Sequence, residues 1–268
     1  MISGLIVYNN YDAKCNRFFI NKCLELLNDD LFSLKFLDEE KLLEYIANNK
    51  VDFVIYRGRN YLLLEELANK GIKTFNNDLT NKTANDKYLT YEFLKENSLP
   101  YIETYLEAKS FPCIMKSVSG HGGQEVFLVK DLEQVNQIKS EHLNFQFIYQ
   151  DFLENDGDVR IYVLNKKVIV SIRRKSQKDY RNNYSLGGEV ELYEPSKDMV
   201  DAAVKIATLL EADFIGVDFL LTKEGYKIIE LEDPVGSRMV YKLKPELDII
   251  KQYVEHIKKE YLISIKVD

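Results

Sequence analysis

Three acidic residues, Asp218, Glu230 and Glu232, stand in two apolar runs that meet at a short polar turn. The runs are Ile215 to Leu221 and Tyr226 to Leu231, and apolar runs joined in this way predict a β-hairpin. Residues two apart in a strand point to the same face, so Glu230 and Glu232 share a side and Asp218 can lie opposite them. Carboxylates gathered on one face repel each other unless a cation neutralises them, and their hard oxygen atoms suit Mg²⁺. The alternative is a hairpin whose acidic side chains face solvent.

A glycine-rich segment follows the strand expected at residues 113–116. From Lys116 it reads Lys-Ser-Val-Ser-Gly-His-Gly-Gly, and a second strand is expected at residues 125–129. Glycines let backbone N–H groups approach a phosphate, and the lysine adds a positive charge. The segment is neither a P-loop nor a dinucleotide fingerprint, because the element after it is a strand. A tight turn without a ligand is the alternative.

A cationic segment covers residues 173–183 in a protein whose net charge is −7. It follows a hairpin expected at residues 159–164 and 168–172, and it comes shortly before the acidic hairpin. Arginines on an anion and carboxylates on Mg²⁺ would together form a phosphate and metal site. A solvated loop is the alternative, as it is for Arg57 and Arg59, which otherwise suit anion binding.

The elements that must position these residues begin with alternating strands and helices. Strands are expected at 5–8, 34–37, 53–56 and 73–75, and helices at 13–27, 39–47 and 61–69. This alternation predicts a small parallel α/β lobe of about 80 residues. Further helices are expected at 88–97, 131–142, 198–210 and 246–261, and a further strand at 146–150.

Composition narrows the class of protein. The 268 residues are 46% apolar and 29% charged, and the acidic balance offers no broad basic surface for nucleic acid. The three cysteines form no Cys-x-x-Cys pair and the three histidines are scattered, which argues against zinc and suits a reducing compartment. No apolar run reaches the roughly 18 residues of a membrane span. We therefore expect a cytoplasmic protein without a nucleic acid or membrane partner.

The order of motifs from Asp86 to Gly236 resembles the ATP-grasp superfamily, most closely its glutamate-ligase-like branch of ribosomal-protein-modification type. The matching pieces are Asp86-Lys87, Pro112 to Lys116 with its glycine loop, Gln150 to Leu153, Gly157 to Arg160, Arg173-Arg174, Asp179 to Asn183, Gly187-Gly188, Gly216 to Asp218 and Glu230 to Glu232. The resemblance implies an α/β and α+β protein: a small parallel α/β lobe, then a two-lobed ATP-grasp fold. The expected domains are 1–82, 83–148 with the glycine-rich lid, and 149–268 with the metal site.

The resemblance also implies roles for individual residues. Lysines and the lid would contact the phosphates of ATP, and the segment around residue 150 would bind adenine. The implied ATP-binding residues are Lys87, Lys116, Gly120, Gly122, Gly123, Gln150, Asp151, Phe152, Leu153, Asp158, Arg181 and Asn183. The implied ligands of Mg²⁺, with Mn²⁺ as an alternative, are Asp218, Glu230 and Glu232. The candidate catalytic residues are Arg160, Arg173 (or Arg174) and Arg181. To these we add Arg238, whose position beside the metal strand, and not the resemblance, suggests that it binds a substrate carboxylate.

In the resembled family a carboxylate attacks the γ-phosphate of ATP, and an amine converts the acyl phosphate into an amide. We therefore expect a carboxylate–amine ligase with small-molecule or peptide substrates, one of them an amino acid. Dimers are common in the resembled family, so a homodimer is one alternative, but the sequence marks no self-complementary face and leaves the oligomeric state open. A kinase on the same fold and a non-catalytic nucleotide-binding module are the alternatives. Two departures stand out: Glu232 replaces the usual Asn, and Asp233-Pro234-Val235 replaces a small residue and proline, so the acceptor pocket is expected to differ.

Overall fold

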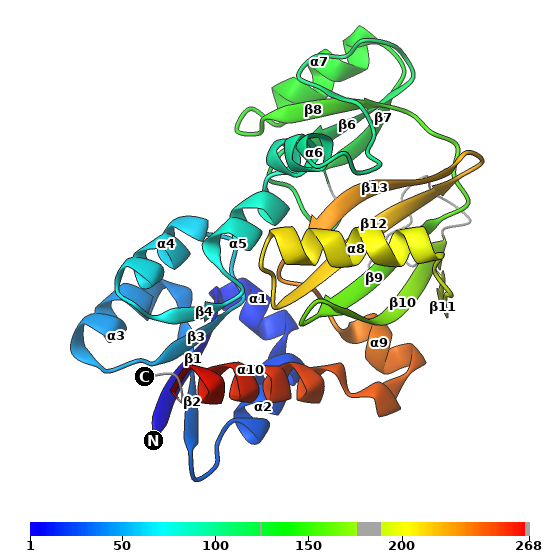
Figure 1. The fold of residues 1–268 in the computed structure, drawn as a ribbon. Helices are drawn as coiled ribbons and strands as arrows, with labels where there is room; N and C mark the ends of the chain where they lie inside the picture. The colour runs from blue at the N-terminus through cyan, green and yellow to red at the C-terminus, as the bar shows by residue number, and fades with distance from the viewer. Residues whose placement is uncertain (124, 176–188, 266–268) are drawn as a thin grey trace.

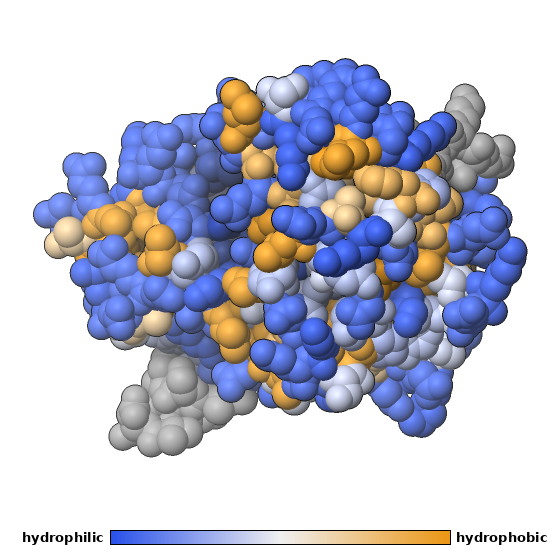
Figure 2. Space-filling model, turned by 90° about the horizontal axis from the view of Figure 1, so that it is seen from above, coloured by the Kyte–Doolittle hydropathy of each residue, from blue (hydrophilic) through white to orange (hydrophobic). Residues whose placement is uncertain are grey.

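The computed structural model describes residues 1–123, 125–175 and 189–265, and its strands form three sheets (Figure 1). One sheet is parallel and lies near the N-terminus, and the other two are antiparallel. This arrangement agrees with the expected parallel α/β lobe followed by two α+β lobes. Across the described residues, none of the helices has both the length and the apolar composition needed to cross a membrane. Hydrophilic side chains cover much of the face in Figure 2, with apolar side chains scattered among them.

The first sheet has the order β2-β1-β3-β4, and we call it with its helices the first lobe. Its strands are β1 (Ile2–Tyr8), β2 (Phe32–Asp38), β3 (Phe53–Tyr56) and β4 (Lys73–Phe75). Its helices are α1 (Asn10–Cys15), α2 (Arg17–Leu26), the 3₁₀ turn η1 (Glu39–Lys41), α3 (Leu42–Asn48) and α4 (Tyr61–Asn69). Alternate residues of β1 enter two different cores, so both faces of the sheet are covered, as in parallel sheets generally.

The single helix expected at residues 13–27 is wrong, because the chain forms α1 and α2 there. Asn9 caps α1 by accepting a hydrogen bond from the Asp12 backbone N–H at 2.8 Å. Asn16 then leaves the helical region with φ −114° and ψ 20°. The apolar residues keep their helical spacing across Asn16, so the sequence pattern did not indicate that one helix ends there and another begins.

Two helices lead out of the first lobe, α5 (Asp78–Asn85) and α6 (Lys87–Glu96). We did not expect α5, because the side chains that it buries are mostly polar: Thr80, Asn81, Thr83 and Ala84. The expected domain boundary between residues 82 and 83 falls within this helix. The division into three domains stays a prediction.

The second sheet has the order β5-β8-β6-β7. Its strands are β5 (Thr104–Tyr105), β6 (Cys113–Ser117), β7 (Val126–Val129) and β8 (Phe147–Asp151), and α7 (Leu132–Glu141) packs against it. A small core around Met115, Val135 and Tyr149 joins the sheet to α7. The sheet therefore presents the start of the glycine-rich segment at the end of β6.

The third sheet has the order β11-β10-β9-β12-β13 and carries α8 (Lys197–Leu209) on one face. Its strands are β9 (Asp158–Leu164), β10 (Lys167–Lys175), β11 (Glu189–Leu192), β12 (Phe214–Thr222) and β13 (Gly225–Glu232). Val159, Ile161 and Val163 of β9 pack against α8, so the residues between them point to the other face.

The chain then returns to the first lobe through α9 (Arg238–Leu243), the 3₁₀ turn η3 (Pro245–Leu247) and α10 (Ile249–Ile265) (Figure 1). The helix expected at residues 246–261 begins later than predicted, and α9 was missed. One apolar core contains Ile6 and Phe53 of the first sheet, Phe214 of the third sheet and Ile257 of α10. This shared core holds the first and third sheets together.

Candidate active site

A cavity of about 440 Å³ lies between the three sheets, and we call it the cleft. Each sheet contributes side chains to its wall, as does the segment that follows β13. Among the residues expected to bind or react, the cleft is lined by Lys87, Lys116, Gly120, Gly122, Gly123, Gln150, Asp151, Phe152, Leu153, Asp158, Arg160, Glu230, Glu232 and Arg238. Sequence motifs that lie up to about 150 residues apart thus meet around one space.

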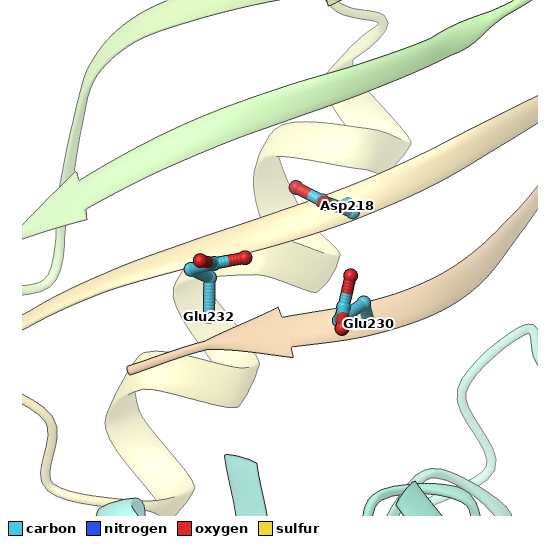
Figure 3. A group of neighbouring side chains, drawn as sticks. All are labelled: Asp218, Glu230 and Glu232. Atoms are coloured by element: carbon cyan, nitrogen blue, oxygen red, sulfur yellow. The ribbon is translucent and has the colours of Figure 1, made fainter. Parts of the chain in front are cut away.

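The acidic cluster consists of Asp218, Glu230 and Glu232, and one oxygen of each lies within 4.8 Å of the others (Figure 3). Asp218 of β12 pairs directly with Glu230 of β13, which confirms that the three acids share one face of the hairpin. Asp218 is fully buried, whereas the side chains of Glu230 and Glu232 are 31% and 27% exposed. Two of the three carboxylates can therefore be reached from the cleft.

Two arginines from the neighbouring strands bind this cluster. Arg160 lies beside Asp218 in the β9–β12 ladder and donates from Nε to Oδ1 and from Nη2 to Oδ2, each at 2.7 Å. The same Nη2 donates to Oε2 of Glu232 at 2.6 Å. Arg174 of β10 donates from Nη2 to Oδ2 of Asp218 at 2.6 Å and from Nε to Oδ1 of Asp158 at 2.5 Å. The polar face of the third sheet is therefore a network of alternating charges.

The network decides which acids ionise easily. Burial alone would raise the pKa of Asp218, but Arg160 and Arg174 outweigh it and hold that pKa at about 2. Burial raises the pKa of Asp158 to about 6, even though the Arg174 guanidinium opposes the change. Burial also raises the pKa of Glu232, against the attraction of Arg160. Asp218 is thus the firmly charged acid of the group.

Two lysines reach the cleft from the other side. Lys87, at the start of α6, donates to the Gly120 carbonyl, and its Nζ lies 3.4 Å from Oε1 of Glu230. Lys116 of β6 places Nζ 3.3 Å from the hydroxyl of Tyr91. Burial lowers the pKa of Lys116 to about 8, although Glu230 partly offsets the effect. The lysines therefore bring positive charge next to the acidic cluster.

The glycine-rich segment has backbone conformations that require glycine. Gly122 and Gly123 have φ of +72° and +74°, in the left-handed region that side chains disfavour. A Cβ at Gly120 would lie 2.0 Å from Oγ of Ser117. Substitution at Gly122 or Gly123 would therefore strain the backbone, whereas substitution at Gly120 would require the Ser117 and Glu125 side chains to move.

Some expected site residues lie elsewhere. Arg173 points away from the cleft and pairs with Asp156 (Nη2 to Oδ2, 2.5 Å) and Glu191 (3.4 Å), because alternate residues of β10 face opposite sides. Its neighbour Arg174 occupies the cleft wall instead. Arg181 and Asn183 lie outside the described residues.

The structure separates the two arginines of the first lobe. Arg57 is buried: its Nη2 donates to the Val235 carbonyl at 2.7 Å, and its guanidinium lies 4.4 Å from the ring centre of Phe19. Arg59 pairs with Asp12 at 2.8 Å and keeps 27% of its side chain exposed. Both arginines line the cleft, but Arg57 is buried and joins the first lobe to the segment after β13, whereas Arg59 is partly exposed.

Arg238 begins α9 and is exposed, and it makes no hydrogen bond or ion pair with the part of the chain that the structure describes. Its guanidinium is therefore open to a ligand in the cleft.

Asn76 and Asn81 were not predicted to belong to the site, and Asp233 was noted only as a departure from the family pattern; the structure brings the three together in buried positions. Both asparagines donate to the Asp233 carboxylate at 2.9 Å. A signal was present, because Asn77, Asn81 and Asn85 recur at every fourth residue and so share one face of a helix.

Comparison with known proteins agrees with this geometry. The model of the RimK-like ATP-grasp domain family matches residues 91–257. "Uncharacterized protein MG011" of Mycoplasma genitalium is 31% identical over 275 residues, which cover 98% of this chain and 95% of that protein. "Probable alpha-L-glutamate ligase" of Histophilus somni is 26% identical over 215 residues, covering 74% of this chain and 72% of that protein. In fold, the chain is similar to the D-alanine–D-alanine ligase of Bacillus anthracis complexed with ATP, with a TM-score of 0.78, 14% identity and 99% of each chain covered. The chain therefore belongs to the RimK-like ATP-grasp family, which confirms the predicted superfamily, its fold and its class as an ATP-grasp ligase.

Proposed function

We propose that the protein forms an amide bond through an acyl phosphate, using ATP and an amino acid or peptide as one substrate. The observation that carries this proposal is the cleft, whose wall brings Lys87, Lys116, Arg160 and Arg174 to the acidic cluster. Phosphoryl transfer depends on positioning and on charge neutralisation more than on covalent chemistry from the protein, and the cleft offers both. The names of the relatives support amino acid substrates, since one is a probable alpha-L-glutamate ligase and another a D-alanine–D-alanine ligase complexed with ATP.

The nucleotide would lie between the second and third sheets. Lys87 and Lys116 would bind its phosphates, and the backbone N–H groups of residues 120–123 would cover them. The segment from Gln150 to Leu153 would bind adenine through its backbone, with Asp158 near the nucleotide. Arg181 and Asn183 stay predicted phosphate contacts.

The acidic cluster fits a divalent cation. It offers three hard oxygen donors within 4.8 Å of each other, and two of the side chains are open to the cleft. A carboxylate oxygen has two lone pairs, so Asp218 can bind a cation while it accepts from the arginines. Asp218, Glu230 and Glu232 would hold Mg²⁺, with Mn²⁺ as the alternative. When bound, the ion would supply charge neutralisation at the phosphates.

The proposed reaction has two steps. An oxygen of the substrate carboxylate attacks the γ-phosphorus of ATP, the bond from that phosphorus to the β,γ-bridging oxygen breaks, and ADP leaves. The amine nitrogen then attacks the acyl carbon, the carbon–oxygen bond to the phosphate breaks, and the nitrogen loses a proton to give an amide and free phosphate. The Nη1 groups of Arg160 and Arg174 make no hydrogen bond with the described residues, so they can donate to the developing oxyanion.

The test is to incubate the protein with Mg-ATP and pools of amino acids, measure ADP and phosphate, and identify products by mass spectrometry. We expect free phosphate together with a product whose mass equals an amide condensation. ADP without free phosphate, with a phosphorylated product, would instead indicate a kinase. Nucleotide binding without turnover in any pool would indicate a binding module.

A matched pair of variants ties the turnover to the cleft. Glu230→Gln removes a proposed ligand charge and should abolish turnover. Glu154→Gln makes the same change at an exposed residue whose partner is Lys223. It should leave turnover unchanged.

A further inference from the structure

Asp233 follows Glu232 directly and is buried, with only 5% of its surface exposed. Glu232 contributes to the acidic cluster, while the Asp233 side chain contacts residues before and within α5. Asn76 Nδ2 donates to Oδ1 of Asp233, and Asn81 Nδ2 donates to Oδ2, both at 2.9 Å. A buried carboxylate next to the cluster is thus held by two neutral amides.

The orientation of both amides is fixed by their other partners. Oδ1 of Asn76 accepts from the backbone N–H groups of Asp213 (2.6 Å) and Phe214 (2.9 Å), so its Nδ2 must face Asp233. Nδ2 of Asn81 also donates to the Gly58 carbonyl at 3.0 Å. Residue 233 therefore needs two acceptor atoms, which aspartate has and asparagine lacks.

The backbone after Glu232 is held as tightly as the Asp233 side chain. Asn85 Nδ2 donates to the Asp233 carbonyl at 2.8 Å and Arg57 donates to the Val235 carbonyl at 2.7 Å. The Tyr162 hydroxyl donates to the Gly236 carbonyl at 3.0 Å. Side chains of the first lobe, α5 and β9 thus fix the path from Glu232 to Arg238.

We propose that Asp233 is a positioning residue: with Asn76 and Asn81 it holds Glu232 in the orientation that binds the metal ion. This inference rests on the proposed metal role of Glu232. Its physical basis is that a side chain which binds a metal must be held in one orientation, and loss of the groups that support metal ligands typically lowers metal affinity by roughly 10- to 100-fold. The segment that leads out of the first lobe, from Asn76 into α5, would therefore contribute to metal binding without touching the ion.

The experiment measures the affinity for the non-hydrolysable analogue AMP-PNP by calorimetry, once with saturating Mg²⁺ and once with EDTA. The ratio of the two dissociation constants is the metal-dependent gain. We expect Asp233→Asn to reduce this gain by about tenfold or more, as loss of other groups that support metal ligands does. The affinity in EDTA should stay unchanged, because the lysines and the glycine-rich segment are not altered. Glu232→Gln gives the loss expected when the ligand itself is weakened.

Asn81→Ala and Asn77→Ser separate positioning from general stability. Asn81→Ala removes one of the two donors to Asp233, so it should also reduce the gain, and it carries the test if Asp233→Asn does not fold. Asn77 lies on the same face of the helix but donates to the Leu210 carbonyl at 3.0 Å, and serine preserves its capping oxygen. Asn77→Ser should therefore lower the melting temperature without changing the gain.

Two results would overturn the inference. An unchanged gain in folded Asp233→Asn, or an equal loss in Asn77→Ser, would show that Asp233 only stabilises the fold. No gain in the wild-type protein would overturn the metal site of the proposed function and this inference with it.

Discussion

Arg160 and Asp218 face each other across β9 and β12 and share two hydrogen bonds, both 2.7 Å long. The Asp218 side chain is 0% exposed and that of Arg160 is 8% exposed. Burying two charged groups costs free energy, and the well-aligned hydrogen bonds between them offset that cost. Removing one group leaves the other buried, charged and unpaired. The pair therefore stabilises the third sheet where that sheet borders the cleft.

Asp218→Asn should lower the free energy of unfolding by about 3–5 kcal/mol, because two buried guanidinium groups lose their shared anion. Urea unfolding followed by circular dichroism measures this change. Glu154→Gln is the control, since Glu154 and Lys223 pair at 2.8 Å but are 76% and 84% exposed. It should cost less than about 1 kcal/mol. Equal losses in the two variants would contradict a role for burial.

Nucleotide affinity should depend on the protonation of Lys116. Its pKa is lowered to about 8, so the ammonium loses its proton as the pH rises through that value. Phosphates bind the charged form, so the affinity for AMP-PNP in EDTA should be constant below about pH 8 and fall above it, by at most about tenfold per pH unit. Calorimetry at a series of pH values measures the profile.

Lys116→Arg is the control for this profile, because a guanidinium stays protonated throughout the range. Its affinity should change less with pH than that of the wild-type protein. A wild-type profile that stays flat above pH 8 would exclude Lys116 as the titrating phosphate contact.

Arg57 and Arg59 should differ in their effect on stability. Arg57→Met leaves the Val235 carbonyl without its donor, and each buried acceptor left unpaired costs about 1–3 kcal/mol. Arg59→Met breaks only a partly exposed pair with Asp12, so it should cost less than about 1 kcal/mol. Thermal or urea unfolding of the two variants compares their stabilities directly. A larger loss of stability for Arg59→Met than for Arg57→Met would contradict the conclusion that Arg57 is the structural arginine of the two.

Arg238 should act on the substrate and not on stability. Arg238→Ala should raise KM for the carboxylate substrate found by the product screen by tenfold or more, as expected for a charged hydrogen bond worth about 1.5–3 kcal/mol. Its melting temperature should not change, because the side chain is exposed and makes no polar contact with the described residues. Arg173→Ala, at an arginine outside the cleft, should leave KM unaltered. If KM stays the same in Arg238→Ala, another group binds the carboxylate.

The acidic hairpin shows what a local pattern can predict. Two apolar runs and a short turn were enough to predict the hairpin. Register counted from the turn would place Asp218 opposite Ile229, however, and a β-bulge between Asp218 and Phe219 shifts Asp218 opposite Glu230. The pattern of apolar residues does not reveal this bulge. The hydrogen-bond partners of Asp218 could not be predicted from the sequence. Arg160 becomes its neighbour because β9 lies beside β12, and a long stretch of chain including α8 separates those strands. No short-range pattern specifies that pairing.

Helix α5 shows a different limit. Apolar periodicity is the main sign of a helix, and α5 has little of it because its buried face carries amides and hydroxyls. Those amides bond to the Leu210 carbonyl and to Asp233, which lie far away in sequence. Recurrence of asparagine at every fourth residue was visible in the sequence, but its meaning depends on acceptors that only the folded chain supplies.

The position of α10 has a consequence for how the chain folds as it is synthesised. Phe53 and Phe75 of the first sheet pack in the core that α10 completes. The ring centres of Tyr261 and Phe53 lie 5.7 Å apart, and the Tyr253 hydroxyl donates to the Phe75 carbonyl. Chains emerge from the ribosome with the N-terminus first. Helix α2 covers part of this face, but the part under α10 must remain uncovered until nearly 250 residues have been made. The first lobe, although earliest in the sequence, therefore completes its native packing late.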